Sequence, residues 1–424
     1  MANVSSSNGI GKQPKLRFPE FTTEWAPSQL GVIGEFYGGL SGKTKEDFGH
    51  GAEKYITYRN VFTNTFASPQ LLESVEVKQN EKQNRVQKGD ALFTQSSETF
   101  EEVGMSSVWL HNSAPFLNSF CMGWHPKTKK LDPVFMGYLL RTPTVRKQIV
   151  CQGQGISRIN LAASRIANID LYHPVLDEQV RVAAFLTLLD KRIECVSDIL
   201  ERLKKYKRGV SNKVFNEVHA DKDSTIINFA DAFVLLQNNT FSRDCLTIEK
   251  TEVLNIHYGD ILVKYGAVVD PSVDAIPYIR EGVDVSKYSS NSYLKNGDVV
   301  FADTAEDYAV GKVCEIFHTD GRKILSGLHT MPFRPTFTCA PMYLGYYLNS
   351  AAYRVQVLPM IQGAKVSSIS KSEIRKTKLY IPSLARQQQI VKVLYALDQR
   401  IDHAERILEA LKKVKTGLLQ HLFV

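Results

Sequence analysis

The amino-acid sequence predicts an α+β protein built as two similar halves. Each half is expected to form a globule with a curved β-sheet and helices, followed by one long helix, and the two long helices are expected to pack as an antiparallel coiled coil. Three observations predict this fold: a tandem repeat, apolar heptads at the end of each repeat, and short β-branched or aromatic runs between turn signals elsewhere.

The repeat is clearest where two prolines begin similar segments. Pro174 begins PVLDEQVRVAAFLTLLDKRIE, and Pro382 begins PSLARQQQIVKVLYALDQRID, so the offset is 382 − 174 = 208 residues. The same offset places Gly137-Tyr138 on Gly345-Tyr346 and the run KGDALF on NGDVVF. We therefore divide the chain into a first domain (1–155), a central helical region (156–220), a second domain (221–363) and a C-terminal helical region (364–424).

The last forty residues of each repeat have the apolar spacing of a coiled-coil helix, with steps of four and three residues. Lys207 and Lys415 interrupt this pattern at equivalent places, and Gly209 and Gly417 interrupt it shortly afterwards. The seam consists of Leu189, Ile193, Val196, Leu200, Leu203, Val210 and Val214 in the first copy, and of Leu397, Ile401, Ala404, Leu408, Leu411, Leu418 and Leu422 in the second. Such a seam predicts that the two helices pack against each other.

The rest of each half has diverged and shows shorter elements. The runs EKYITYRNVF, ALFTQ, DILVKYG and DVVFAD are typical of strands, and Gly-Asp pairs punctuate them. The segments PVFMGYLLRTPTVRKQIV and APMYLGYYLNSAAYRVQVL predict helices that lead into the repeated region.

Composition narrows the class of protein. The balance of 52 basic against 44 acidic residues gives a net charge of +8, which suits a polyanion such as DNA but also many ordinary basic proteins. The six cysteines are scattered singly, which favours reduced thiols over a zinc site or disulfide framework. The polar start MANVSSSNGIGKQPK has no apolar signal-peptide core, and no apolar run could span a bilayer, so a cytoplasmic protein is expected.

The stretch FYGGLSGKTKEDFG resembles the end of a phosphate-binding P-loop, but its spacing is one residue short. The residues after Thr44 are polar and broken by glycine, and the second half has Asn238-Asn239 where the first has Gly38-Gly39. Because both residue types tolerate left-handed backbone angles, the halves share a tight turn followed by a polar loop. No catalytic motif or metal-ligand spacing was found, and no catalytic or metal residue is predicted.

Taken together, the sequence resembles a specificity subunit of a type I restriction–modification system. The resemblance covers nearly the whole chain and is carried by the opening PKLRFPEFTTEW, the Gly-Gly turn, the repeated Gly-Asp-hydrophobic run, and the helix starts PVLDEQ and PSLARQ. The family's usual Glu-Gln is present as Glu178-Gln179, whereas the second copy has Arg386 before Gln387.

The resemblance implies a DNA-binding protein that is not itself an enzyme. Two target recognition domains would each read one half of a split site on double-stranded DNA, and the helices would set the spacer and dock two modification subunits. S-adenosylmethionine would be bound by those N6-adenine methyltransferase subunits, and ATP and Mg by the restriction (motor-nuclease) subunits, so no cofactor is expected on this chain.

The resemblance also directs the choice of site residues. Polar and aromatic side chains near the predicted turns are the candidates for DNA contact: Lys43, Thr44, Lys45, Tyr58, Arg59, Asn60, Gln95, Ser96 and Ser97 in the first half, and Asn239, Ser242, Arg243, Lys264, Tyr265, Arg280, Asp303, Thr304 and Lys312 in the second. Tyr58, Arg59 and Asn60 are expected to end a strand. Residues shared by the two helices are the candidates for partner binding: Gln179, Asp190, Arg192, Gln387, Asp398 and Arg400.

Two alternatives remain at this point. One is a P-loop NTPase built on Gly42-Lys43-Thr44, and the other is a scaffold that holds two proteins by its coiled coil without binding DNA.

Overall fold

The computed structural model describes residues 13–307, 309–363 and 366–424. The start of the first predicted domain, with most of the polar N-terminal segment, and the start of the C-terminal region at 364–365 therefore lie outside the described residues. The chain forms two compact units, and the boundary between them crosses both long helices. Unit 1 consists of Met1–Ser197 and Arg406–Val424, and unit 2 consists of Asp198–Glu405.

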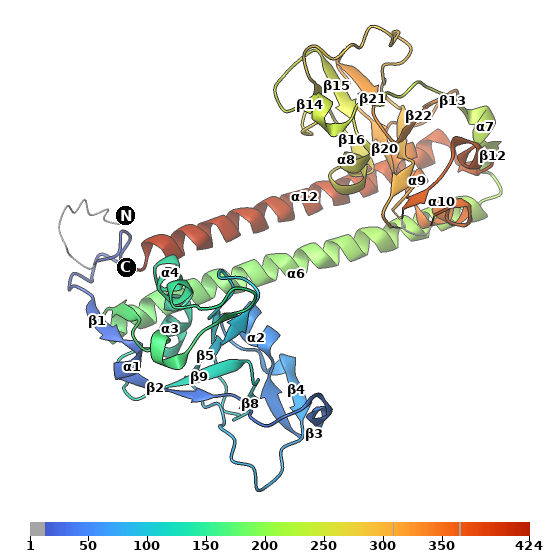
Figure 1. The fold of residues 1–424 in the computed structure, drawn as a ribbon. Helices are drawn as coiled ribbons and strands as arrows, with labels where there is room; N and C mark the ends of the chain where they lie inside the picture. The colour runs from blue at the N-terminus through green and yellow to red at the C-terminus, as the bar shows by residue number, and fades with distance from the viewer. Residues whose placement is uncertain (1–12, 308, 364–365) are drawn as a thin grey trace. The chain divides into compact units, whose positions relative to one another are not determined.

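Unit 1 contains several small sheets rather than one large one (Figure 1). The larger two are the sheet β2 (Gly34–Gly38), β9 (Cys121–Pro126), β5 (Ala91–Thr94), β7 (Ser106–Val108), and the sheet β4 (Leu72–Val75), β3 (Phe48–Ile56), β8 (Phe116–Leu117). Two-stranded pairs are formed by β1 (Ala26–Gln29) with β11 (Asp170–His173) and by β6 (Ser96–Ser97) with β10 (Ile159–Asn160). Helices α3 (Pro133–Leu139) and α4 (Pro143–Cys151) bury Phe135 and Ile149 in the same core as Trp124.

Unit 2 repeats this plan with more strands. Its sheets are β13 (Phe233–Leu235), β22 (Thr330–Pro335), β18 (Val299–Ala302), β20 (Val313–Ile316), β16 (Val268–Val269), and β14 (Leu246–Thr247), β17 (Tyr278–Ile279), β15 (Val253–Ile256), β21 (Lys323–Ser326). Two-stranded pairs are formed by β12 (Thr225–Asn228) with β24 (Lys378–Ile381) and by β19 (Thr304–Ala305) with β23 (Ser367–Ser368). Helices α9 (Tyr343–Leu348) and α10 (Ala351–Val357) occupy the places predicted for them.

The sequence repeat is also a structural repeat. Adding 208 to the residue numbers of β5, β10 and β11 gives the bounds of β18, β23 and β24. The strand pairs that include these elements, β6–β10 and β1–β11 in unit 1 and β19–β23 and β12–β24 in unit 2, are all antiparallel. The two units therefore share these strand pairs, although unit 2 has additional strands and the loops differ.

Two predicted strands are helices. Strand β3 ends at Ile56, and residues 58–60 begin helix α2 (Tyr58–Thr63) instead of ending the strand. The run DILVKYG likewise lies in helix α8 (Tyr258–Val263) and the turn after it. In both cases the side chain before the helix, Thr57 or His257, accepts a hydrogen bond from a backbone N–H of the first turn. This capping contact outweighs the strand preference of the short apolar run.

The two long helices are continuous. Helix α6 (Leu176–Ala220) has 45 residues and helix α12 (Leu384–His421) has 38, so Gly209 and Gly417 lie inside helices and do not interrupt them. Unit 2 contains the ion pairs Lys204–Glu405 and Lys207–Asp398, in which residue numbers rise along α6 and fall along α12. The helices are therefore antiparallel, as the heptads predicted.

All six cysteines are free thiols. Across the part of the chain that the structure describes, no helix is both long and apolar enough to cross a membrane.

Candidate nucleic-acid interface and helix junctions

In unit 1, the start of helix α2 lies beside the segment that follows strand β5. The Tyr58 hydroxyl donates to the Ser96 carbonyl oxygen at 2.8 Å. Ser96 and Ser97 form strand β6 and are buried, whereas Gln95 is half-buried and Arg59 is exposed. Asn60 is fully buried, and its amide bonds the backbone of Ser68. The predicted residues therefore gather in one place, but only Tyr58, Arg59 and Gln95 among them have side chains that reach the surface.

Unit 2 has an equivalent cluster at the start of helix α8. Asp303 and Thr304 follow β18 as Gln95 and Ser96 follow β5, because 95 + 208 = 303. The His329 imidazole lies 3.3 Å from the Asp303 carboxylate, and the rings of Tyr258 and His329 are 5.2 Å apart. The sequence analysis missed Tyr258 and His329. The tyrosine was detectable, since Ile-Thr-Tyr at 56–58 resembles Ile-His-Tyr at 256–258, while His329 lies on a distant turn.

A buried carboxylate with two cations lies next to this cluster. Asp260 is 1% exposed and forms ion pairs with Arg243 at 2.6 Å and Lys264 at 2.9 Å, and both cations are half-exposed. Burial acts to raise the pKa of Asp260, but the hydrogen bonds from Arg243 and Lys264 outweigh it and hold the pKa below its ordinary value. Two cations against one anion leave a net positive charge here, which favours a phosphate backbone as neighbour.

Other predicted residues of unit 2 lie inside the fold. The Lys312 ammonium donates to the carbonyl oxygens of Leu262 and Tyr265 at 3.0 and 2.9 Å, at the end of α8. Tyr265 is 5% exposed, and Asn239 is fully buried with its amide donating to Asn255 at 2.6 Å. Ser242 and Arg280 are exposed. In this structure the buried residues stabilise the loops, and DNA contact by any of the residues remains a prediction.

The Gly-Lys-Thr stretch is not open to a nucleotide. The Lys43 side chain is 3% exposed, and its ammonium lies 2.6 Å from Glu81 and 3.9 Å from Asp47. Thr44 caps the short helix Lys45–Asp47, and Lys45 is exposed. A Cβ at Gly39 would approach the Asn118 carbonyl oxygen to 2.1 Å, so the turn requires glycine there. The lysine that a P-loop would need for phosphate is engaged by two carboxylates.

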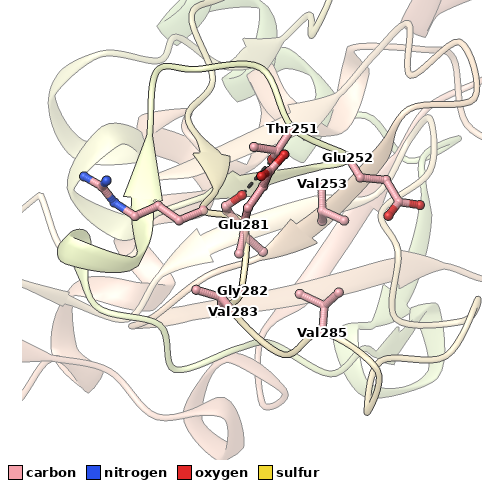
Figure 2. A pocket seen from close by; sticks show the side chains of 9 residues that line it. Thr251, Glu252, Val253, Glu281, Gly282, Val283 and Val285 are labelled. Carbon is pink, nitrogen blue, oxygen red and sulfur yellow. Dashed lines mark hydrogen bonds between the residues drawn. The ribbon is translucent and has the colours of Figure 1, made fainter.

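A hollow of about 260 Å³ opens in unit 2 at the start of β15 and the end of β17 (Figure 2). Glu252, Glu281 and Val283 are among its lining residues, and the Thr251 hydroxyl donates to the Ile279 carbonyl oxygen at 2.7 Å. Arg280 also lines it. Glu252 forms an ion pair with Lys323, so these charges largely offset one another and the hollow gives no clear preference for an anion or a cation.

The start of each long helix is fixed by a glutamine. The Gln179 amide accepts from the Asp132 N–H at 2.8 Å and donates to the Pro174 carbonyl oxygen at 2.8 Å. Gln387 makes the equivalent bonds with Ala340 and Pro382 at 2.8 and 2.9 Å. Both glutamines are almost fully buried, so in this structure they join each globular part to its helix.

The residue before each glutamine differs between the two copies of the repeat, and so do its contacts. Glu178 is buried and forms a two-bond ion pair with Arg17 of the opening segment, at 2.8 and 2.7 Å. Arg386, which replaces it in the second copy, instead donates to Glu217 near the end of α6 at 2.9 Å.

The remaining predicted partner-binding residues divide into two kinds. Asp190 bonds Lys415 and Tyr138 within unit 1, and Asp398 bonds Lys207 and Tyr346 within unit 2. Arg192 and Arg400 are exposed, and no ion pair of theirs appears among the described residues. These two arginines are the predicted residues that a partner protein could reach directly.

The long helices also carry apolar hollows at equivalent positions. In unit 1, Leu418 of α12 and Leu422, just after its end, line a hollow of about 270 Å³ together with Phe18 and Phe185. In unit 2, a larger open groove on α6 is lined by Val210 and Val214, which correspond to Leu418 and Leu422 by the offset of 208. Leu422 is buried, but Leu418, Val210 and Val214 are partly exposed, and partly exposed apolar side chains at repeated places are typical of surfaces that bind other proteins.

Two similar α+β units with different polar loops and shared antiparallel helices define a class of protein: a duplicated, helix-linked module. The family described as "Type I restriction modification DNA specificity domain" matches residues 22–205 and 246–413, which is most of the chain. The chain belongs to this family and is a type I restriction–modification specificity subunit.

Known proteins agree with this assignment. The chain is 22% identical over 349 residues to the putative type I restriction enzyme MjaX specificity subunit of Methanocaldococcus jannaschii, covering 79% of this chain and 77% of that protein. It is 21% identical over 322 residues to the type I restriction enzyme MjaVIII specificity subunit of the same organism, covering 72% of this chain and 73% of that protein. The crystal structure of the type I system S subunit from M. genitalium matches its fold with a TM-score of 0.58 at 16% identity, covering 97% of this chain and 99% of that one.

Proposed function

We propose that each unit reads one half of a split DNA site and that the two half-sites differ. The observation that carries this proposal is the pair of equivalent clusters at the starts of α2 and α8. A tyrosine begins each helix, and the neighbouring segment is Gln95-Ser96-Ser97 in unit 1 but Asp303-Thr304-Ala305 in unit 2. A glutamine amide can bond adenine, whereas a carboxylate accepts from the cytosine amino group. The same scaffold would therefore select different bases.

Phosphate contacts would come from the surrounding cations. Arg243 and Lys264 are half-exposed beside the unit 2 cluster, and Arg59 and Lys45 are exposed in unit 1. Such contacts orient a protein on duplex DNA without reading its sequence. The chain is proposed to be non-catalytic, and methyl transfer would belong to modification subunits that bind S-adenosylmethionine. ATP and Mg would be used by restriction subunits.

The long helices are proposed to bind two identical modification subunits and to set the spacer between the half-sites. The hollow lined by Leu418 and Leu422 and the groove lined by Val210 and Val214 support two equivalent docking places. Arg192 and Arg400, which also correspond by the repeat, would add equivalent polar contacts.

An exchange of domains tests the proposal. Residues 16–155 are replaced by the corresponding residues of a relative, the chain is expressed with its modification subunit, and methylated sites are mapped by methylome sequencing. One half of the methylated site is expected to change while the other half and the spacer stay the same. A change in both halves would refute the assignment of one half-site to each unit.

Two further measurements separate the alternatives. A scaffold that does not bind DNA would give no sequence-dependent gel shift in the assembled complex. A P-loop NTPase would lose nucleotide binding when Lys43 is replaced by alanine, whereas we expect no ATP binding by either protein because Glu81 and Asp47 already hold that ammonium group.

A further inference from the structure

The two lysines that break the apolar seam take part in equivalent three-residue contacts. In unit 1, one oxygen of the Asp190 carboxylate lies 2.6 Å from the Lys415 ammonium, and the other oxygen accepts a hydrogen bond from the Tyr138 hydroxyl at 3.0 Å. In unit 2, one oxygen of the Asp398 carboxylate forms an ion pair with the Lys207 ammonium, and the other oxygen accepts a hydrogen bond from the Tyr346 hydroxyl at 2.7 Å. We name these contacts the unit 1 junction and the unit 2 junction.

The junctions are related by the sequence repeat. The offset of 208 converts Tyr138 into Tyr346, Asp190 into Asp398, and Lys207 into Lys415. Each junction therefore takes its tyrosine and aspartate from one copy of the repeat and its lysine from the other copy. A reciprocal arrangement of this kind requires α6 and α12 to pair in one relative position within each unit.

Each junction joins three elements. The tyrosine comes from the helix that packs in the globular core, α3 or α9, and the aspartate from the long helix that continues the same repeat. The lysine comes from the other long helix and also lies over the tyrosine ring, 5.8 Å from the ring centre in unit 1 and 5.4 Å in unit 2. The globular part is thus bonded to both helices at a single point.

Partial burial makes these contacts sensitive to small movements of the helices. The tyrosines are 1% and 4% exposed, and the charged side chains are between 25% and 30% exposed. Apolar side chains in a helix seam tolerate small sliding movements, because one aliphatic contact replaces another. A partly buried carboxylate between a hydroxyl and an ammonium does not, because movement leaves a polar group unpaired. Polar residues in apolar helix interfaces are known to specify register in this way.

We infer that the two junctions are positioning devices that hold each DNA-reading unit in one orientation on the helix pair and so determine how strictly the complex measures the spacer between half-sites. This inference rests on the proposed function and adds the residues responsible for it. Lys207, Asp398 and Tyr346 act in unit 2, and Lys415, Asp190 and Tyr138 in unit 1.

The test replaces one junction by apolar side chains of similar size. The variant Lys207→Met, Asp398→Leu, Tyr346→Phe removes every polar group together, so none is left unpaired, and apolar replacement of a partly buried ion pair is often neutral for stability. The matched control is Lys204→Met, Glu405→Leu. This pair joins the same two helices in unit 2 at 2.8 Å, but both side chains are 47% exposed.

The measurement uses the specificity subunit assembled with its modification subunits. The site is first read by methylome sequencing, and kcat/KM for methylation is then compared between duplexes with the natural spacer and duplexes with one base pair added or removed. We expect the junction variant to lose at least tenfold of the wild-type preference for the natural spacer, with half-site sequences unchanged. The control variant is expected to keep the preference.

A role in stability alone would lower activity on all duplexes equally and leave the ratio unchanged, and that result would overturn the inference. If the triple variant does not fold, Tyr346→Phe alone decides, because it keeps the ion pair and removes one hydroxyl. It is expected to reduce the spacer preference severalfold, and an unchanged ratio overturns the inference. If the wild-type complex shows no split site at all, the proposed function fails instead.

Discussion

Glu315 gives a prediction that depends on one buried carboxyl group. It lies on β20, is 2% exposed, and accepts hydrogen bonds from the backbone N–H groups of Met342 at 2.6 Å and Gly345 at 2.8 Å, at the start of α9. Burial raises the pKa of Glu315 from 4.5 to about 7, although the N–H groups act to lower it. In unit 1 the corresponding position is Ser107, and Asp132 caps α3 instead.

The raised pKa links the stability of unit 2 to pH. Between pH 4.5 and 7 the folded protein holds a proton that the unfolded chain releases, so the contribution is complete below pH 4.5 and is lost as pH rises through 7. The difference, 7 − 4.5 = 2.5 pKa units, corresponds to a loss of about 3 kcal/mol in the free energy of unfolding, at about 1.4 kcal/mol per unit.

The perturbation is Glu315→Gln, which keeps one oxygen acceptor for the helix start but cannot titrate. Urea titrations at pH 5, 6, 7 and 8 are followed by hydrogen exchange of peptides covering residues 340–350, which report on unit 2. Other groups titrate equally in both proteins, so the wild-type curve is expected to fall relative to the variant curve by roughly the free energy given above as pH rises.

The three tryptophans provide an internal control. Trp25, Trp109 and Trp124 all lie in unit 1, so tryptophan fluorescence reports on the unfolding of that unit and is expected to show no effect of the substitution. Parallel pH curves for the wild type and the variant in the unit 2 peptides would refute the reasoning. They would mean that the backbone N–H groups outweigh burial and keep the carboxyl ionised throughout.

Three other predictions concern single side chains. Gly209→Ala and Gly417→Ala are each expected to raise the free energy of unfolding by about 1 kcal/mol in urea titrations, because both glycines lie inside helices with open space at the Cβ position; a loss of stability would contradict this. Asp298→Asn should lower the free energy of unfolding by about 3 kcal/mol in the same assay, because it removes the charge of a carboxylate that is 1% exposed and lies 2.6 Å from Arg334. An unchanged midpoint would show that this ion pair contributes little. Lys43→Ala should lower the melting temperature of unit 1 by several degrees because Glu81 loses its cation, which differential scanning calorimetry with Lys45→Ala as the exposed control can measure.

The sequence predicted the long, periodic features of the fold better than the short ones. The repeat of 208 residues and the heptads predicted α6 and α12, their antiparallel pairing and the order of elements, and the structure confirmed these features. Short apolar runs were less informative. The segments at Tyr58 and Tyr258 have the composition of strands, and a capping side chain one residue earlier makes them helices.

The candidate site shows the same division. The sequence repeat placed Gln95 and Asp303 at equivalent positions after KGDALF and NGDVVF, but it could not show that helices begin beside them or that Asn239 and Lys312 are held inside the fold. Whether a polar side chain faces solvent or a buried partner depends on residues far away in the chain, and a loop sequence carries no period that reveals them.

The sequence by itself determined the duplicated architecture, because self-similarity and heptad periodicity are properties of the linear chain. Only the tertiary structure decided what Lys207 and Lys415 do. Their partners Asp398 and Asp190 lie 191 and 225 residues away in the sequence (398 − 207 and 415 − 190). In the sequence the two lysines therefore only interrupt an apolar pattern, and their ion pairs become visible when the helices pack. An isolated charge at a helix interface is unfavourable, and its meaning comes from the carboxylate and hydroxyl that folding brings to it.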